Sequence, residues 1–285
     1  MTTFKHILFP VDFSDRCNGA TPFVENMAHK CGARVTLLAI AHPVYAGGLA
    51  GAAVVAPQEM LAAVKTQLDS HFANSFARLR VERVAEIGEP AQVITDYAMA
   101  HEVDLVMMPT HGYGPFRQLL LGSTTAKVLH DLARPVWTTA HKGDAPDRAH
   151  LEPQNLLCAI DGSLHSAGVM QSAAALATEL GASLRFVHVV PGIEAWPERQ
   201  MDVELEEEMR LAAKQNIESM AASLGIDAPV CIRAGTVADG VAEEASRHGS
   251  DLLLIGRGKM QDTLGRLRTH AYGIIRLSPC PVLSF

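Results

Sequence analysis

The sequence predicts an α/β protein built from two doubly wound parallel-sheet domains in tandem. Short apolar runs alternate with longer amphipathic stretches, and strands that are apolar on both faces are typical of a parallel sheet covered by helices. The second half also repeats landmarks of the first: Asp12-Phe13-Ser14 returns as Asp161-Gly162-Ser163, and Gly32-Ala33 as Gly181-Ala182. A repeat as long as a domain indicates duplication, because the period of a solenoid is much shorter.

In the first half, each element has a local justification. Residues 6–11 form an apolar run that predicts a buried strand, and Ser14 can cap the helix that follows and stops at Gly32. After the strand that ends at Gly88, Pro90 can open a helix at its first turn. The predicted strands cover 6–11, 34–41, 81–87, 104–108 and 136–139, and the predicted helices cover 14–30, 58–79, a segment from 90, and 124–132.

The second half repeats this order. Its predicted strands cover 155–160, 183–190, 230–233, 252–255 and 282–285, and its predicted helices cover 164–180, 197–224, 237–248 and 269–277. Between the halves, residues 141–153 carry Lys, Gly, Asp, Pro and Arg without an apolar period, which indicates a linker. We therefore expect a first domain over 1–141, a linker over 142–153 and a second domain over 154–285.

Composition excludes several classes of function. The formal net charge of −7 argues against a nucleic-acid binder and against a general attraction to anionic membranes. No stretch approaches the roughly 18 apolar residues of a transmembrane helix, and the start lacks a signal peptide, so we expect a cytoplasmic protein. The five cysteines lack Cys-x-x-Cys spacing and the 13 histidines lack metal-ligand spacing, so buried thiols and no metal site are expected.

The candidate site lies where two predicted strands end. Ligands of doubly wound sheets bind beyond the carboxyl ends of the strands, where the strand order switches. Asp12 follows the first strand, and its carboxylate can accept a hydrogen bond from an exocyclic amine or a hydroxyl. The alternative is that Asp12 only caps the next helix or binds loop amides.

The fourth strand is followed by a glycine-containing loop. It reads Pro109-Thr110-His111-Gly112, then nine residues, then Gly122-Ser123-Thr124 at a predicted helix start. Glycines allow the backbone to approach a phosphate, and a helix start offers free amides and a positive dipole. Ser123 and Thr124 add hydroxyl donors. The loop is not a Walker loop, because it has no Gly-Lys-Ser/Thr.

On these residues, the two halves resemble two universal stress protein domains, and the chain is similar to a tandem member of that family, with Rossmann-like domains. In the family, a Gly-x-x-Gly loop, nine residues and Gly-Ser/Thr cradle the phosphates of ATP. Lys127-Val128-Leu129 and Arg134-Pro135-Val136 are also family-like. The resemblance implies that Asp12 contacts adenosine and Ile40 contacts adenine. The nucleotide-binding residues that it implies are Pro10, Val11, Asp12, Phe13, Ile40, Met108, Pro109, Thr110, His111, Gly112, Gly122, Ser123 and Thr124.

The chain departs from the family pattern in both halves. Pro109 replaces the first loop glycine and has no backbone N–H. If that position only has to be small, ATP binding survives; if its amide is needed, the affinity for ATP is weakened. In the second half, Lys259 replaces a loop glycine and Arg268 stands where Gly-Ser/Thr should begin, so we expect no ATP there in the family manner. Two alternatives stay open for Arg257, Lys259, Arg266 and Arg268: a different anion site, or a solvated basic loop.

Two histidines have alternatives as well. His111 either touches phosphate or positions a water, or it is a surface loop residue. His188 lies in an apolar strand, where a histidine with satisfied hydrogen bonds is expected more often than a ligand.

The expected function is that of a stress-response regulatory protein that binds ATP, AMP or ADP, with Mg²⁺ as an optional companion. The first domain would hold the nucleotide, and the second would be a pseudo-symmetric partner within the chain, with the last strands of both domains paired. A further homodimer and an unidentified protein partner are left open. The alternatives are a slow ATPase and a nucleotide-free scaffold. No catalytic residue is predicted, because no nucleophile and base pair stands out.

Overall fold

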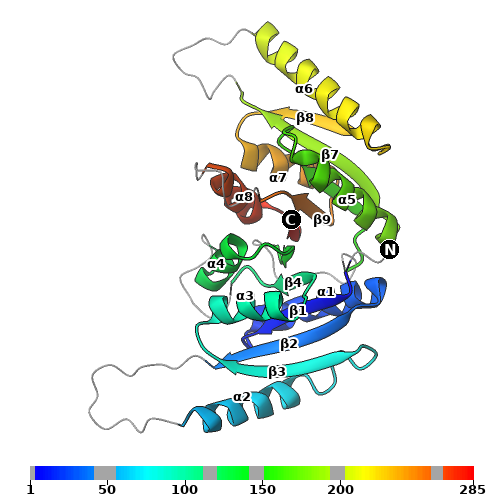
Figure 1. The fold of residues 1–285 in the computed structure, drawn as a ribbon. Coiled ribbons are helices and arrows are strands. Elements are labelled where there is room, and N and C mark those ends of the chain that lie inside the picture. The colour runs from blue at the N-terminus through cyan, green and yellow to red at the C-terminus, as the bar shows by residue number, and fades with distance from the viewer. Residues whose placement is uncertain (1–3, 42–55, 112–120, 141–150, 193–202, 258–265) are drawn as a thin grey trace, which may run out of the picture. The chain divides into compact units, whose positions relative to one another are not determined.

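The computed structural model describes residues 4–41, 56–111, 121–140, 151–192, 203–257 and 266–285 (Figure 1). The chain divides into two compact units, residues 1–117 with 122–136 and residues 118–121 with 137–285. Each unit is described by itself. Both are α/β with parallel strands, which confirms the predicted fold class. The domain limits at 141 and 154 stay predictions.

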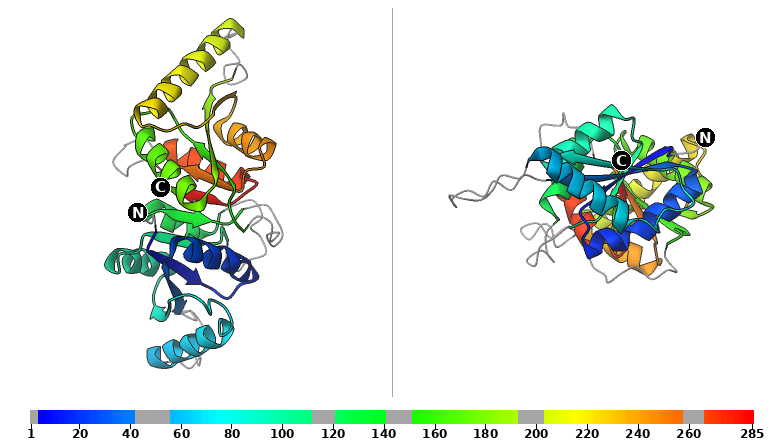
Figure 2. Two further views of the ribbon diagram at one scale, coloured as in Figure 1. Left: turned by 90° about the vertical axis from the view of Figure 1, so that its right-hand side faces the viewer. Right: turned by 90° about the horizontal axis from the view of Figure 1, so that it is seen from below.

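The first unit has its strands in the order β3-β2-β1-β4-β5. The pairs β1–β2, β1–β4 and β2–β3 are parallel. Helices lie on both sides of the strands (Figures 1 and 2). The elements are β1 (His6–Val11), α1 (Asp15–Cys31), β2 (Arg34–Ala41), α2 (Pro57–His71), β3 (Val81–Ile87), α3 (Pro90–Ala100), β4 (Leu105–Met108), α4 (Ser123–Asp131) and β5 (Val136–Thr138).

The predicted start and stop signals act as expected. All six residues of β1 are buried. The Ser14 hydroxyl accepts a hydrogen bond from the Cys17 amide at 3.2 Å and caps α1, which ends at Gly32 in the left-handed conformation with φ 62°. Pro90 occupies the first turn of α3.

One predicted helix is shorter than expected. The helix predicted over 58–79 ends at His71 as α2. Phe76 takes a left-handed φ of 64° and its amide donates to the Glu25 carboxylate, so the helical hydrogen bonding cannot continue. Phe72 and Phe76 pack against Phe9 with ring centroids 6.5 and 6.4 Å away. Burial of these two rings fixes the chain after α2.

The second unit repeats the architecture with the strand order β10-β9-β6-β7-β8. Contacts between α5 and α6 and between α7 and α8 place one pair of helices on each face of the sheet. Helix α8 begins at Arg266, three residues before the predicted start; the residues 193–202, which include the predicted start of α6, lie outside the described part. The elements are β6 (Asn155–Ala159), α5 (Ser166–Leu180), β7 (Ser183–Val190), α6 (Val203–Ser223), β8 (Val230–Ala234), α7 (Val237–Arg247), β9 (Leu252–Ile255), α8 (Arg266–Leu277) and β10 (Val282–Ser284). None of the helices described in either unit is long and apolar enough to cross a membrane.

Candidate functional site

The strand order of the first unit reverses between β1 and β4. From β1 the chain moves outward to β2 and β3, and it returns to β4 on the other side of β1. In such sheets the carboxyl ends at the reversal form the ligand crevice. Asp12 follows β1 and Pro109 follows β4 at this point. Val11, the last residue of β1, pairs with Ala39, so Asp12 follows β1 at the level of Ile40, which lies near the carboxyl end of β2.

The loop after β1 is tightly folded around Asp12. Its Oδ1 accepts hydrogen bonds from the Ser14 amide at 3.0 Å and the Ser14 hydroxyl at 2.6 Å. Binding of a loop amide, one of the two roles predicted for Asp12, is therefore present. The side chain is exposed, and its Oδ2 makes no hydrogen bond within the described residues. No donor among the described residues occupies Oδ2, so this oxygen can accept a hydrogen bond from a ligand.

Phe13 has an unusual backbone conformation for its residue type. Its φ is 61°, in the left-handed region, which costs a residue with a side chain roughly 1–2 kcal/mol. The ring stands edge-on to His71, with centroids 5.5 Å apart. The corresponding residue of the second unit is Gly162 with φ 75°, where the same turn costs less. Backbone strain of this kind is concentrated at functional sites.

The two ends of the glycine-containing loop are joined directly. The Gly122 amide donates to the Thr110 carbonyl at 2.9 Å, and the Thr125 hydroxyl donates to the Pro109 carbonyl at 3.0 Å. A Cβ on Gly122 would lie 3.3 Å from the Thr110 oxygen and 3.4 Å from the His111 Cα. The φ of Gly122 is −57°, which residues with a side chain also adopt. Glycine is therefore favoured there by the close approach of Thr110 and His111 and not by its backbone conformation. Gly112 lies outside the described residues.

The start of α4 offers unused backbone donors beside this junction. Gly122 is the N-cap and provides no side chain to cap the helix. The first helical hydrogen bond runs from the Ala126 amide to the Gly122 carbonyl at 2.8 Å. The amides of Ser123 and Thr124 have no acceptor within the described residues, and the Ser123 side chain is exposed. Free amides and the helix dipole make such a start favourable for an anion.

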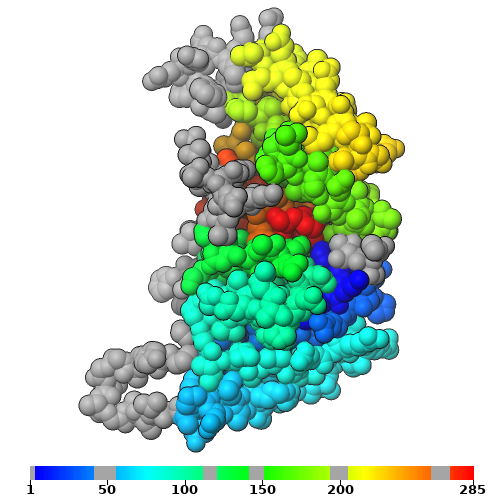
Figure 3. Space-filling model, in the orientation of Figure 1, coloured from blue at the N-terminus to red at the C-terminus, as the bar shows by residue number. Residues whose placement is uncertain are grey.

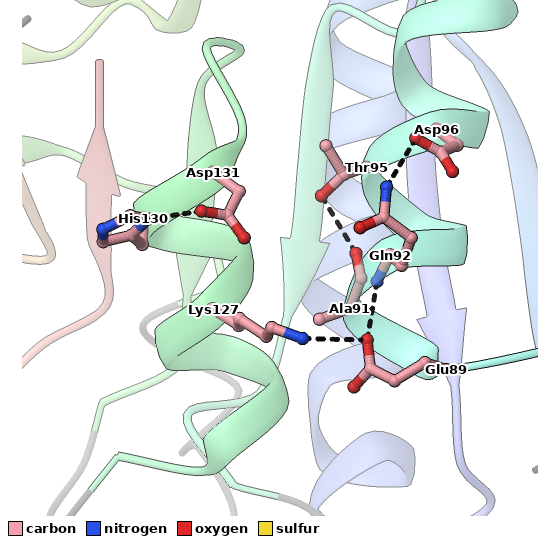
Figure 4. A network of polar contacts seen from close by, with 8 residues as sticks. All are labelled: Glu89, Ala91, Gln92, Thr95, Asp96, Lys127, His130 and Asp131. Carbon is pink, nitrogen blue, oxygen red and sulfur yellow. Dashed lines mark hydrogen bonds and ion pairs between the residues drawn. The ribbon is translucent and has the colours of Figure 1, made fainter. Parts of the chain in front are cut away.

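A polar network holds α4 against α3 (Figure 4). The Lys127 ammonium lies 3.4 Å from Glu89 Oε2, and the same oxygen accepts the Gln92 amide at 3.0 Å as the N-cap of α3. The Gln92 amide and then Lys127 lower the pKa of the Glu89 carboxyl. Lys127, noted above as family-like, thus forms an exposed ion pair between α4 and the N-cap residue of α3.

His111 is not the surface residue that one alternative predicted, because only 2% of it is exposed. Its Nδ1 lies 3.1 Å from the Thr110 hydroxyl and 3.4 Å from Arg16 Nη1. Arg16, from the first turn of α1, is an addition that the sequence did not reveal, because no motif marks that position. Thr125 was also missed, although it directly follows the two hydroxyl residues that were named.

The other predicted residues fall into two groups by exposure. Pro10, Val11, Met108, Pro109 and Thr110 are buried, so that they can line the crevice chiefly with backbone atoms. Ile40 is half-buried in the otherwise buried carboxyl half of β2, and Thr124 is half-buried as well. The chain after β1 contacts the chain after β4 through Arg16 and His111, and the grouping of the other predicted residues around one ligand stays a prediction.

The second unit keeps the aspartate but changes the helix start. Asp161 Oδ1 accepts the Ser163 amide at 3.0 Å and the Ser166 hydroxyl at 2.7 Å, as Asp12 does with Ser14. Burial alone would raise the pKa of the Asp161 carboxyl, but hydrogen bonds, led by that of the Ser166 hydroxyl, outweigh burial and lower the pKa. Because α8 begins at Arg266, Arg268 lies inside the first turn, whereas its counterpart Gly122 precedes α4.

The basic residues of this second loop are only partly described. Lys259 lies outside the described residues, and so do the side chains of Arg266 and Arg268. Arg257 is half-buried, and burial lowers the pKa of its guanidinium to about 10. Neither alternative for this loop is tested by these contacts.

His188 has the hydrogen bond expected of a satisfied strand histidine, since its Nδ1 lies 2.9 Å from the Ile160 carbonyl oxygen. Across the described ranges, no three His, Cys, Asp or Glu side chains are grouped so that they could hold a metal ion.

Comparison with known proteins adds the family. The model of the universal stress protein family matches residues 3–139 and 153–285. Universal stress protein Slr1230 of Synechocystis is 38% identical over 61 residues, which are 21% of this chain and 21% of that protein. The chain therefore matches much less than two thirds of this relative.

Two solved structures are similar over almost the whole chain. A universal stress protein from Archaeoglobus fulgidus has a TM-score of 0.69 and 20% identity, with 98% of this chain and 95% of that chain covered. A functionally unknown protein from Pseudomonas aeruginosa has a TM-score of 0.68 and 15% identity, with coverage of 100% and 93%. At these identities the likeness concerns the fold. Because the family model matches both halves, the chain belongs to the universal stress protein family as a tandem, two-domain member.

Proposed function

We propose that the first unit binds an adenine nucleotide, ATP or one of its products AMP and ADP, with or without Mg²⁺, and that the chain is a nucleotide-binding regulatory protein of the cytoplasm. The observation that supports this proposal is the junction between Gly122 and Thr110, which joins the start of α4 to the chain that follows β4, the strand next to β1 at the strand-order reversal. Family membership agrees with this proposal.

Each part of the crevice has a role in the proposal. The amides and hydroxyls of Ser123 and Thr124 would hold the phosphates. Asp12 would accept a hydrogen bond from the adenosine part through Oδ2, and Ile40 would pack against the adenine ring. Pro109 contributes a carbonyl that accepts the Thr125 hydroxyl, and its missing amide weakens binding only if the phosphates need a donor at this position.

Slow hydrolysis of ATP is the second candidate, and one contact favours it. The Thr110 hydroxyl and His111 Nδ1 lie 3.1 Å apart, a distance at which an imidazole can activate a hydroxyl. Against it, no part of Thr110 is exposed, and a nucleophile must reach its substrate. Loss of hydrolysis with retained ATP binding in His111→Ala would favour the enzyme.

The second unit would act as the pseudo-symmetric partner of the first within the chain, with no nucleotide of its own. A homodimer of the chain and a protein partner that reads the nucleotide state are extensions of the same proposal. If no nucleotide binds, the chain would instead function as a nucleotide-free scaffold.

The test is calorimetric titration of nucleotide-free protein with ATP. Gly122→Arg should abolish binding, because a side chain there begins 3.3 Å from the Thr110 carbonyl and extends over the α4 amides. Gly168→Arg is the matched control, since a Cβ at Gly168 meets nothing within 4 Å. Retained affinity in a folded Gly122→Arg would contradict the proposed site.

A further inference from the structure

The second unit has a hollow of about 470 Å³ along its edge strand β8, between α6 and α7. Helix α6, yellow in Figure 3, lies at the surface beside it. The hollow is unusually basic for a chain of net charge −7. Its basic side chains are Arg185, Arg210, Lys214, Arg233, Arg247 and His248, and its acidic ones are Glu207 and Glu244. We call it the basic hollow.

Part of this positive charge compensates a buried carboxylate. Glu244 is only 1% exposed, and a buried carboxylate requires cationic neighbours. His248 Nε2 lies 2.9 Å from Glu244 Oε1, and Arg233 Nε lies 3.9 Å from Oε2. Arg233 also pairs with Glu243 at 2.9 Å, and Arg210 pairs with Glu206 at 2.7 Å. Lys214 lies 3.7 Å from Glu218, so ion pairs account for four of the six basic side chains.

Two arginines remain without such an explanation. Neither Arg185 nor Arg247 forms an ion pair with any of the described residues. Val187 pairs with Cys231 and Val189 with Arg233, so Arg185, Cys231 and Arg233 project from the same face of the sheet. Arg247 comes from α7, which packs closely on this face: a Cβ on Gly240 would lie 3.0 Å from Val189 and 3.5 Å from the Arg233 Cβ.

We propose that the basic hollow binds a small soluble phosphate-bearing anion, held by the guanidinium groups of Arg185 and Arg247. The planar fork of arginine suits the oxygens of a phosphate, and the hollow is lined by one such arginine from β7 and one from α7. Arg233, which is held by Glu243 and Glu244, contributes further positive charge to the lining of the hollow. This site is separate in sequence and in chemistry from the crevice of the first unit. Protection of the edge strand by charged residues is the competing explanation.

The experiment uses the full chain carrying Gly122→Arg, which is expected to remove nucleotide binding by the first unit. Inorganic phosphate and glycerol phosphate are titrated calorimetrically, and Arg185→Gln and Arg247→Gln are each expected to weaken binding about tenfold. Arg276→Gln, an exposed arginine of α8 outside the basic hollow, is the control and should leave the affinity unchanged. Tighter binding of glycerol phosphate than of inorganic phosphate would identify a phosphorylated metabolite.

Cys231 provides an independent readout. It lines the basic hollow and is half-buried, whereas the other four cysteines are buried. Phosphate should slow its reaction with a thiol reagent, and the double variant Arg185→Gln/Arg247→Gln should lose this protection while melting like the parent chain. No heat of phosphate binding, or equal affinity in the arginine variants and the parent, would overturn the proposal. Neither result would bear on ATP binding by the first unit.

Discussion

The hydroxyl of Thr125 anchors the start of α4 to the end of β4, and removing it should weaken the first unit. Thr125 is 3% exposed, and its hydroxyl is the only partner of the buried Pro109 carbonyl among the described residues. Thr125→Val keeps the shape but orphans that carbonyl, which costs about 1–3 kcal/mol. The added methyl returns less than about 1 kcal/mol. The net loss of about 1–2 kcal/mol should lower the melting temperature by about 3–8 °C.

Differential scanning calorimetry of nucleotide-free protein measures this shift, and hydrogen exchange of peptides over residues 105–131 locates it. Thr95→Val is the matched control. The Thr95 hydroxyl also donates to a carbonyl, that of Ala91 at 2.9 Å, but the Ala91 carbonyl lies inside α3 and keeps its helical partner (Figure 4). Thr95→Val should change stability by less than about 0.5 kcal/mol. Equal melting temperatures for Thr125→Val and the parent would refute the anchoring role.

Three further predictions concern the first unit. Asp12→Ala should weaken adenosine binding about tenfold while the affinity for tripolyphosphate changes little, measured by calorimetry; equal losses would contradict the assigned role of Asp12. Gly122→Ala should destabilise the protein by about 1 kcal/mol, because the added Cβ would lie 3.3 Å from the Thr110 carbonyl oxygen. Gly168→Ala in α5, where a Cβ meets nothing within 4 Å, should stabilise it by about 0.5–1 kcal/mol. Thermal melts that reverse this order would refute the close approach at Gly122. Burial and the nearby Arg34 guanidinium lower the pKa of His6 from 6.5. The stability that depends on neutral His6 is therefore complete above pH 6.5 and is lost as the pH falls through the lowered pKa. Melting temperatures measured between about pH 7.5 and 5 should fall less in His6→Gln than in the parent.

The elements that the sequence predicts well are those with local signals. β1 follows from its apolar run, and α1 from Ser14 and Gly32, which act on their own helix. Each of these signals depends on residues a few positions apart. The repeat of Asp12 as Asp161 has a structural counterpart, because each carboxylate accepts the amide of the residue two positions later.

The predictions fail where contacts between residues far apart in the sequence determine the structure. The end of α2 depends on Glu25 and Phe9, which lie far earlier in the chain than Phe76. The buried His111 contacts Arg16, 95 residues away in the sequence. Neither contact leaves a periodic pattern in the sequence, so a reading of local signals cannot find it.

The measurement that tests the central claim most directly is the nucleotide content of the freshly purified protein. The chain is denatured, and the adenine nucleotide that it releases is quantified by chromatography with mass detection. About one nucleotide per chain is predicted, because the first unit keeps Gly122 before α4 whereas α8 of the second unit starts earlier and carries Arg268 in its first turn. No nucleotide, together with a failed ATP titration, would contradict nucleotide binding, and two per chain would contradict an empty second unit.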